Sequence, residues 1–81
     1  MLARRQALGR RLRDLRTAAP YTQAGLATAA GMDRAFYVGV EGGRRNISLD
    51  KLFALADALH VDIRDLFTDP ANDRVIDSPA P

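Results

Sequence analysis

Apolar residues recur along this chain at helical spacing, in segments separated by short connections rich in polar residues, glycine or proline. Leu8, Leu12 and Leu15 follow one another at intervals of four and three residues, which places them on one face of a helix predicted over residues 3–17. Pro20 cannot continue a helix, because it lacks the backbone N–H donor. The pattern therefore predicts an amphipathic first helix with its leucines inward, followed by a short connection.

Two short helices with a tight turn between them are predicted next. Thr22 is suited to cap the first of these helices, and Gly31 is suited to end it in a left-handed conformation. Asp33 is suited to cap the second, which is predicted over residues 34–41 and is followed by two glycines. The apolar face of the earlier helix carries Leu26, Ala27 and Ala30. Two helices joined this closely form a helix-turn-helix, which presents its second helix to a DNA groove.

The rest of the chain predicts two more helices and a tail. Ser48 is suited to cap a fourth helix, SLDKLFALADALH, and a short fifth helix is expected over residues 63–67. The predicted apolar face of the fourth helix is formed by Leu49, Leu52, Phe53, Ala56 and Leu59. No segment has the period of a strand, and residues 68–81 hold three of the four prolines. We therefore predict an all-α protein, with a DNA-binding domain over residues 1–67 and a flexible C-terminal tail over residues 68–81.

Composition narrows the class of protein. With 81 residues, the chain forms one domain whose small core makes dimerisation a reasonable expectation. No apolar run approaches the ~20 residues of a membrane span. A secretory signal has an uninterrupted apolar core, whereas arginines interrupt the apolar residues of this N-terminus. The chain has no cysteine, hence no disulfide framework. These features predict a soluble, cytoplasmic protein with no membrane association.

Charge is unevenly divided between the two halves of the chain. Residues 1–45 hold nine arginines against three acidic residues, net +6, whereas residues 46–81 hold three basic residues against seven aspartates, net −4. A basic half that contains the predicted groove-facing helix suits a domain with one face turned to a polyanion. The alternative interpretation is a set of solvated helix faces.

The predicted helix over residues 34–41 has two distinct sides on a helical wheel. Tyr37 and Val40 point inward. The outward side carries Arg34, Ala35, Val38 and Gly39. Arg34, in the first turn, has the guanidinium geometry for a bidentate contact to guanine, and its alternative is a plain surface arginine. Ala35 and Val38 offer apolar contact, most naturally to a thymine methyl.

Other residues of this region are candidates for contact with the DNA backbone. Gln23 follows the cap of its helix, where a phosphate is favoured. Arg44, Arg45 and Asn46 would flank the groove and add salt-sensitive affinity, unless they form an ordinary basic loop. Gly39 costs about 1 kcal/mol inside a helix, which close approach to DNA, a helix that tightens on binding, or simple drift would explain.

Three segments together give the chain a specific resemblance: LGRRLRDLR, TQAGLATAAGMDR, and YVGVEGGRRNISLDKLFALADALHVDIRDLF. Over residues 8–67 the chain resembles the Cro and phage-repressor (Xre-type) helix-turn-helix family. The segment MDRAFYVGVEGGRRNISLDKL is most similar to the controller proteins of restriction-modification systems and related small regulators. The resemblance implies a compact five-helix, lambda-repressor-like domain that binds double-stranded DNA and is usually dimeric.

The resemblance also implies roles for individual residues. It implies phosphate contact by Gln23, backbone contact by the loop over residues 44–46, and an ion pair between Arg16 and Glu41 that ties the first helix to the third. Base reading is implied for Arg34, Ala35, Val38 and Gly39. The chain departs from the usual family pattern at Pro20, Gly25, Tyr37 and Gly39.

Catalysis has little support in this sequence. His60, the one histidine, ends an amphipathic helix, where it complements the helix dipole more often than it acts as a base. Ser48 is better explained as a cap. The spacing of the aspartates matches no EF-hand loop. We therefore expect no enzyme activity, no catalytic residue, no metal and no cofactor.

These observations favour a homodimeric, sequence-specific transcriptional regulator that binds a palindromic operator. The candidate dimer surface lies at the end of the fourth helix and in the fifth, with the intramolecular core as the alternative place for its members. These members are His60, Val61, Ile63, Leu66 and Phe67. Two other functions stay open: an antitoxin-type regulator whose acidic half or tail contacts a toxin, and an adaptor that binds another protein and no longer reads DNA.

Overall fold

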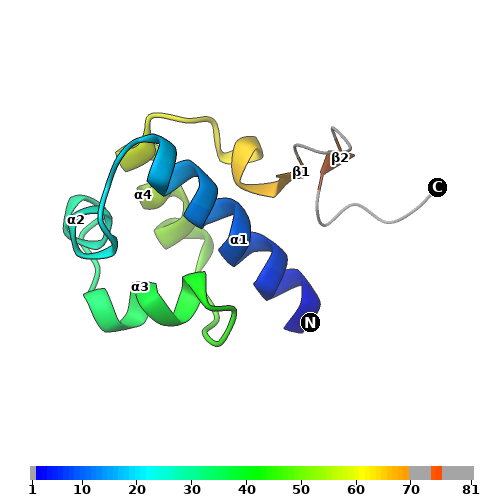
Figure 1. Cartoon of the computed structure of the whole chain (residues 1–81), viewed down its shortest axis with the longest axis horizontal. Helices are drawn as coiled ribbons and strands as arrows, with labels where there is room; N and C mark the ends of the chain where they lie inside the picture. Colours follow the sequence, from blue (N-terminus) through cyan, green and yellow to red (C-terminus); the bar gives the residue numbers. More distant parts are fainter. Residues whose placement is uncertain (1, 70–73, 76–81) are drawn as a thin grey trace.

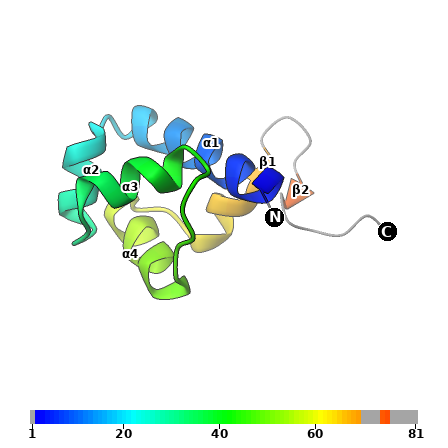
Figure 2. The ribbon, with the colours of Figure 1, turned by 90° about the horizontal axis from the view of Figure 1, so that it is seen from below.

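Four α-helices form the body of the protein (Figure 1). In the computed structural model, residues 2–69 and 74–75 are described. The α-helices are α1 (Leu2–Ala18), α2 (Gln23–Ala29), α3 (Arg34–Glu41) and α4 (Leu49–Leu59). They are followed by a 3-10 helix, η1 (Ile63–Phe67), and two short strands, β1 (Thr68–Asp69) and β2 (Arg74–Val75). In Figure 1, α1 runs between η1 on one side and α3 on the other, and Figure 2 looks at the molecule from the side of α3.

The predicted caps begin three of the helices. The Thr22 hydroxyl accepts a hydrogen bond from the Gly25 N–H at 2.9 Å, at the start of α2. At the start of α3, an Asp33 carboxylate oxygen accepts from the Phe36 N–H at 3.1 Å, and Ser48 serves α4 in the same way. Each cap satisfies a backbone donor that the helix leaves free, which is worth about 1 kcal/mol. Capping therefore makes the boundaries of these short helices readable from sequence.

The core lies where the inner faces of the four helices meet. It is formed by Leu12, Leu26, Ala27, Tyr37, Val40, Leu52, Leu55, Ala56, Leu59 and Leu66. One prediction for α4 is wrong: Leu49 and Phe53 are 61% and 45% exposed, and Leu55 is buried in their place. The predicted stripe was too wide, because only the side of α4 that faces α2 and η1 is covered. Two large apolar side chains are therefore left on the surface.

The predicted fifth α-helix is a 3-10 helix. Its turn is closed by the Asp65 N–H, which donates to the carbonyl of Asp62 three residues earlier at 2.9 Å. A carboxylate oxygen of Asp62 also accepts from the Arg64 N–H at 2.8 Å. Five residues are too few for a stable α-helix but suit a single tighter turn. Over the described residues, the helical body therefore consists of four α-helices and one 3-10 helix rather than five α-helices.

The chain beyond η1 contains a short pairing that the sequence did not predict. β1 and β2 are antiparallel, with Thr68 opposite Val75 and Asp69 opposite Arg74. Strands of two residues are too short to produce a readable alternation of side chains. The other residues of the predicted flexible tail, 70–73 and 76–81, lie outside the described residues.

Close backbone contact brings α1 against the C-terminal end of α3. Gly9 is buried, and a Cβ atom placed on it would lie 2.1 Å from the carbonyl oxygen of Glu41 and 3.0 Å from that of Val40. Both obstacles are backbone atoms, so no side-chain rotation relieves the clash. At Gly9, the backbone of α1 therefore lies so close to the end of α3 that there is no room for a Cβ atom.

Substitution of Gly9 by alanine tests this contact. Alanine at an unobstructed helical position is more favourable than glycine by about 1 kcal/mol. Here the methyl group must push α1 away from α3, so we expect G9A to lower the free energy of unfolding by about 1–3 kcal/mol. Urea unfolding followed by circular dichroism measures the change. An increase in stability would contradict the close approach.

Candidate nucleic-acid interface

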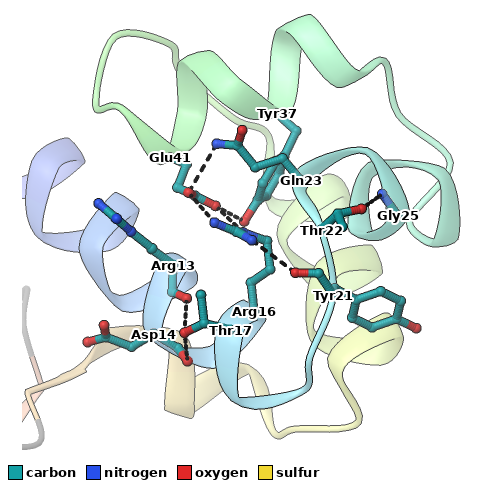
Figure 3. A network of polar contacts seen from close by, with 10 residues as sticks. All are labelled: Arg13, Asp14, Arg16, Thr17, Tyr21, Thr22, Gln23, Gly25, Tyr37 and Glu41. Atoms are coloured by element: carbon teal, nitrogen blue, oxygen red, sulfur yellow. Dashed lines mark hydrogen bonds and ion pairs between the residues drawn. The ribbon is translucent and has the colours of Figure 1, made fainter.

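A single carboxylate, that of Glu41, joins α1 to the two helices of the helix-turn-helix, α2 and α3 (Figure 3). From α1, Arg16 donates two hydrogen bonds to it, Nε to Oε2 at 2.8 Å and Nη2 to Oε1 at 3.0 Å. The Tyr37 hydroxyl donates to Oε2 at 2.5 Å from within α3. From α2, the side-chain amide of Gln23 donates to Oε1 at 3.2 Å. The ion pair that the family resemblance implied between Arg16 and Glu41 is present and bidentate.

The third nitrogen of the Arg16 guanidinium extends this network to the α1–α2 connection. Its Nη1 donates to the carbonyl of Tyr21 at 2.9 Å. The Arg16 and Glu41 side chains are only 12% and 7% exposed, so the pair is largely removed from water. A buried pair of this kind stabilises a fold only when its remaining hydrogen-bonding groups are also satisfied. The contacts with Tyr21, Gln23 and Tyr37 meet that requirement.

The protonation of the network follows from these contacts. Burial by itself raises the pKa of Glu41, but the hydrogen bonds from Arg16, Tyr37 and Gln23 outweigh it, and the net pKa is lowered. The pKa of Tyr37 is raised, first by burial and then by its hydrogen bond to Glu41. At neutral pH, the network therefore contains an ionised carboxylate and a neutral phenol that donates to it.

Tyr37 and Gln23 have roles here that the sequence did not reveal. Tyr37 was recognised as an inward residue, and it is fully buried. Its hydroxyl donates to Glu41, which lies four residues later, one helical turn along α3. Side chains at this spacing can meet in any α-helix. Gln23 was predicted to meet a phosphate, and its side-chain nitrogen is already engaged by Glu41. The side chain thus has a set position at the edge of the helix-turn-helix.

The outward side of α3 is only partly as predicted. Arg34 and Ala35 are exposed in the first turn of the helix, and Val38 is half-buried. Gly39 is buried, contrary to the prediction, because the side chain of Arg45 lies across it. A Cβ atom on Gly39 would lie 2.4 Å from Cγ of Arg45. This packing explains a glycine inside α3, and it removes Gly39 from the surface that faces solvent.

The loop after α3 is exposed and anchored by its backbone. Arg44, Arg45 and Asn46 are all exposed. The Gly39 carbonyl accepts hydrogen bonds from the Arg44 N–H at 2.8 Å and from the Arg45 N–H at 3.2 Å. Gly43 turns the chain with φ of +76°. Two guanidinium groups are therefore held beside the end of α3 on a defined backbone.

The five residues of the predicted dimer surface differ in their burial. Leu66 is fully buried in the core of its own chain, so this prediction is wrong for Leu66. His60 is exposed. Val61, Ile63 and Phe67 are partly buried and pack against the core. The sequence could not separate these cases, because apolar residues of a short helix serve a core and an interface equally well.

Within the described residues, none of the helices has the length and apolar character that a membrane crossing requires. In the same part of the chain, no three histidine, aspartate or glutamate side chains come together as metal ligands. The arrangement combines the exposed first turn of α3, a basic loop after the other end of α3, and a polar network that fixes α3 against α1 and α2. This combination defines a helix-turn-helix DNA-binding protein.

Comparison with known proteins identifies the family. A helix-turn-helix domain family model matches residues 7–67, and the chain belongs to this family. The family and the solved structures that resemble the chain are Xre-type helix-turn-helix regulators of transcription that bind DNA, a regulatory rather than an enzymatic class. No curated protein matches the chain.

Several solved structures share both the fold and part of the sequence. The restriction-modification controller protein C.AhdI from Aeromonas hydrophila is 46% identical, with a TM-score of 0.79, over 80% of this chain and 98% of that one. A hypothetical transcription factor, NHTF, from Neisseria is 32% identical, with a TM-score of 0.80, over 84% and 76% of the two chains. The clp gene regulator ClgR from Corynebacterium glutamicum is 30% identical, with a TM-score of 0.75, over 82% and 68%.

The contribution of the Tyr37 hydroxyl to the network is testable by substitution. A hydrogen bond to a charged group contributes about 1.5–3 kcal/mol, so we expect Y37F to lower the free energy of unfolding at pH 7 by that amount. Y21F is the matched control, because the Tyr21 hydroxyl makes only a long 3.4 Å contact with the Ala58 carbonyl. Urea unfolding of both variants measures the difference. Equal losses in the two variants would show that the Glu41 contact adds nothing.

The same variant carries an expected pH dependence. Because the folded-state pKa of Glu41 is lowered, its stabilising contribution is complete above the unfolded-state pKa of about 4.3 and is lost as the pH falls through the folded value. Y37F removes one of the hydrogen bonds that lower this pKa. The stability of Y37F should therefore change less than that of the wild type on acidification from neutral pH.

Proposed function

We propose that this protein is a sequence-specific transcriptional regulator that acts in the cytoplasm as a homodimer on a palindromic operator. The observation that carries the proposal is the pairing of an exposed α3 N-terminus with a basic loop. The Glu41 network holds α3, and the Gly39 carbonyl anchors the loop. The 46% identity with a restriction-modification controller protein across nearly its whole length supports this choice within the family.

Base reading is assigned to the first part of α3. Arg34 is exposed next to the Asp33 cap, and its guanidinium is free to enter a major groove and contact guanine O6 and N7. Ala35 and Val38 follow on the same side and offer methyl groups to thymine. Gly39 keeps an indirect role, because its lack of a side chain allows Arg45 to lie along α3.

Backbone contact is assigned to Gln23 and to the loop over residues 44–46. The Gln23 side chain is held at the edge of α2 by Glu41, and the three loop side chains are exposed. Charged and amide groups on both sides of a recognition helix fix its register on the duplex without reading sequence. The guanidinium groups of Arg44 and Arg45 add affinity that falls with increasing salt.

The dimer surface is assigned to the exposed side of α4. Leu49 and Phe53 are exposed and one turn apart on α4, and the exposed His60 follows the helix as its left-handed C-cap residue. Val61, Ile63 and Phe67 adjoin its C-terminal end. Two exposed large apolar side chains on a domain with a small core are the natural centre of a self-complementary interface.

Dimerisation and operator symmetry are tested together. Selection of bound duplexes from a random library should yield two inverted half-sites centred about 34 Å apart, one DNA turn. F53E places a charge in the proposed interface, and it should halve the mass measured by light scattering and abolish binding to the twofold site. T28E, at an exposed position of α2, is the control for added charge in the mass measurement. A dimeric F53E protein would move the interface elsewhere on the surface.

The division between base and backbone contacts is tested with two arginine variants. R34A should cost roughly 1–3 kcal/mol on the selected site and leave binding to a scrambled duplex nearly intact. R45A should weaken both duplexes alike and reduce the salt dependence. Fluorescence anisotropy measures all four affinities. If R34A weakens both duplexes equally, Arg34 does not read bases; if R45A harms the selected site alone, Arg45 does.

A further inference from the structure

The side of α1 that faces α3 contains a cation that the proposed DNA contacts do not use. Gly9 touches the backbone of Glu41 at the end of α3, and Arg16 holds the Glu41 carboxylate. Arg13 lies between them, one turn after Gly9 and one turn before Arg16, so it shares their side of the helix. In Figure 3, the Arg13 side chain leaves α1 on the side of Glu41, and Asp14 points away from it.

The surroundings of Arg13 leave its charge available. Arg13 is exposed, and its guanidinium makes no hydrogen bond or ion pair with any other described residue. The Glu41 carboxylate, with which Arg16 of the same side of α1 pairs, is saturated by Arg16, Tyr37 and Gln23 and is only 7% exposed. A free guanidinium beside a neutralised carboxylate attracts an anion that approaches from solvent.

The same network places Arg13 near a proposed phosphate contact. Gln23 meets Glu41 at Oε1, the oxygen that also accepts from Arg16 Nη2. Arg16 is one turn from Arg13 on the same side of α1. Arg13 is therefore linked to Gln23 through two residues, Arg16 on the same side of α1 and Glu41 at the end of α3.

We propose that Arg13 binds a phosphate of the DNA backbone next to the one at Gln23, so that α1 extends the DNA-binding surface beyond the helix-turn-helix and its loop. This inference rests on the proposed function. On this proposal, one side of α1 has two roles. The largely buried Arg16 holds α3 in place through Glu41, and the exposed Arg13 contacts the duplex. Because phosphate contacts carry no sequence information, Arg13 contributes affinity and register but no base preference.

The test compares R13Q with R64Q, each of which removes one exposed positive charge. Arg64 lies in η1, which is across α1 from α3, so its loss should leave DNA binding nearly unchanged. Affinities for the selected operator and for a scrambled duplex are measured by fluorescence anisotropy across a range of salt concentrations. R13K keeps the charge and should retain most of the binding, and thermal unfolding checks that all variants fold.

We expect R13Q to weaken both duplexes by the same factor. The magnitude of the slope of log affinity against log salt concentration should decrease by about 0.9 per protomer. The fold-decrease in affinity between about 50 and 200 mM salt should therefore be about 3.5 times smaller, per protomer, in R13Q than in the wild type. A slope in R13Q equal to that of R64Q and of the wild type would overturn the role of Arg13 and leave the proposed function intact. Absence of salt-dependent binding in the wild type would instead overturn the proposed function, and this inference with it.

Discussion

The convergence of donors on Glu41 is the interaction on which the arrangement of the helices depends. A carboxylate with a 7% exposed side chain is tolerated only because charged and neutral donors from α1, α2 and α3 satisfy it. No two of these helices can shift relative to each other without leaving a buried charge short of partners. In a domain of this size, where apolar burial alone is modest, such a requirement specifies one packing of the helix-turn-helix against α1.

Glycine allows the close approaches that the network needs. At Gly9, the backbone of α1 reaches the carbonyl of Glu41, which brings Arg16 within reach of the carboxylate. At Gly39, the outer side of α3 is flat enough for the Arg45 side chain to cover it. The two glycines therefore do different work on opposite sides of α3: one positions the helix inside the domain, and the other positions a loop cation beside its exposed end.

Local chemistry made much of the fold predictable from sequence. Thr22, Asp33 and Ser48 are capping residues whose partners lie three residues away, and the predicted bounds of α3 agree with the structure. What failed depended on contacts between distant segments: the exposure of Leu49 and Phe53, the burial of Leu66, and the cover over Gly39. Helical periodicity says which residues share a side, but not how much of that side a neighbouring helix covers. At the site, the Arg16–Glu41 pair came from family resemblance, whereas the convergence of Gln23 and Tyr37 on it needed the tertiary structure.

The burial of Gly39 changes how specificity must be divided on the proposed roles. Arg34 is then the one side chain on the exposed start of α3 with hydrogen-bonding groups for base edges, since Ala35 and Val38 offer methyl groups alone. A bidentate contact discriminates by roughly 1–3 kcal/mol, so two protomers supply about 30-fold to 20,000-fold from this source. Specific DNA-binding proteins typically prefer their sites by about 10³–10⁷. The upper end of the Arg34 contribution lies within this range, whereas the lower end falls short and needs thymine contacts, DNA shape between the half-sites, or Arg45 beside α3 in addition. On the proposed roles, α3 of one protomer offers a single side chain for hydrogen bonds to base edges, so the pairing of two protomers on one operator squares the discrimination that each supplies.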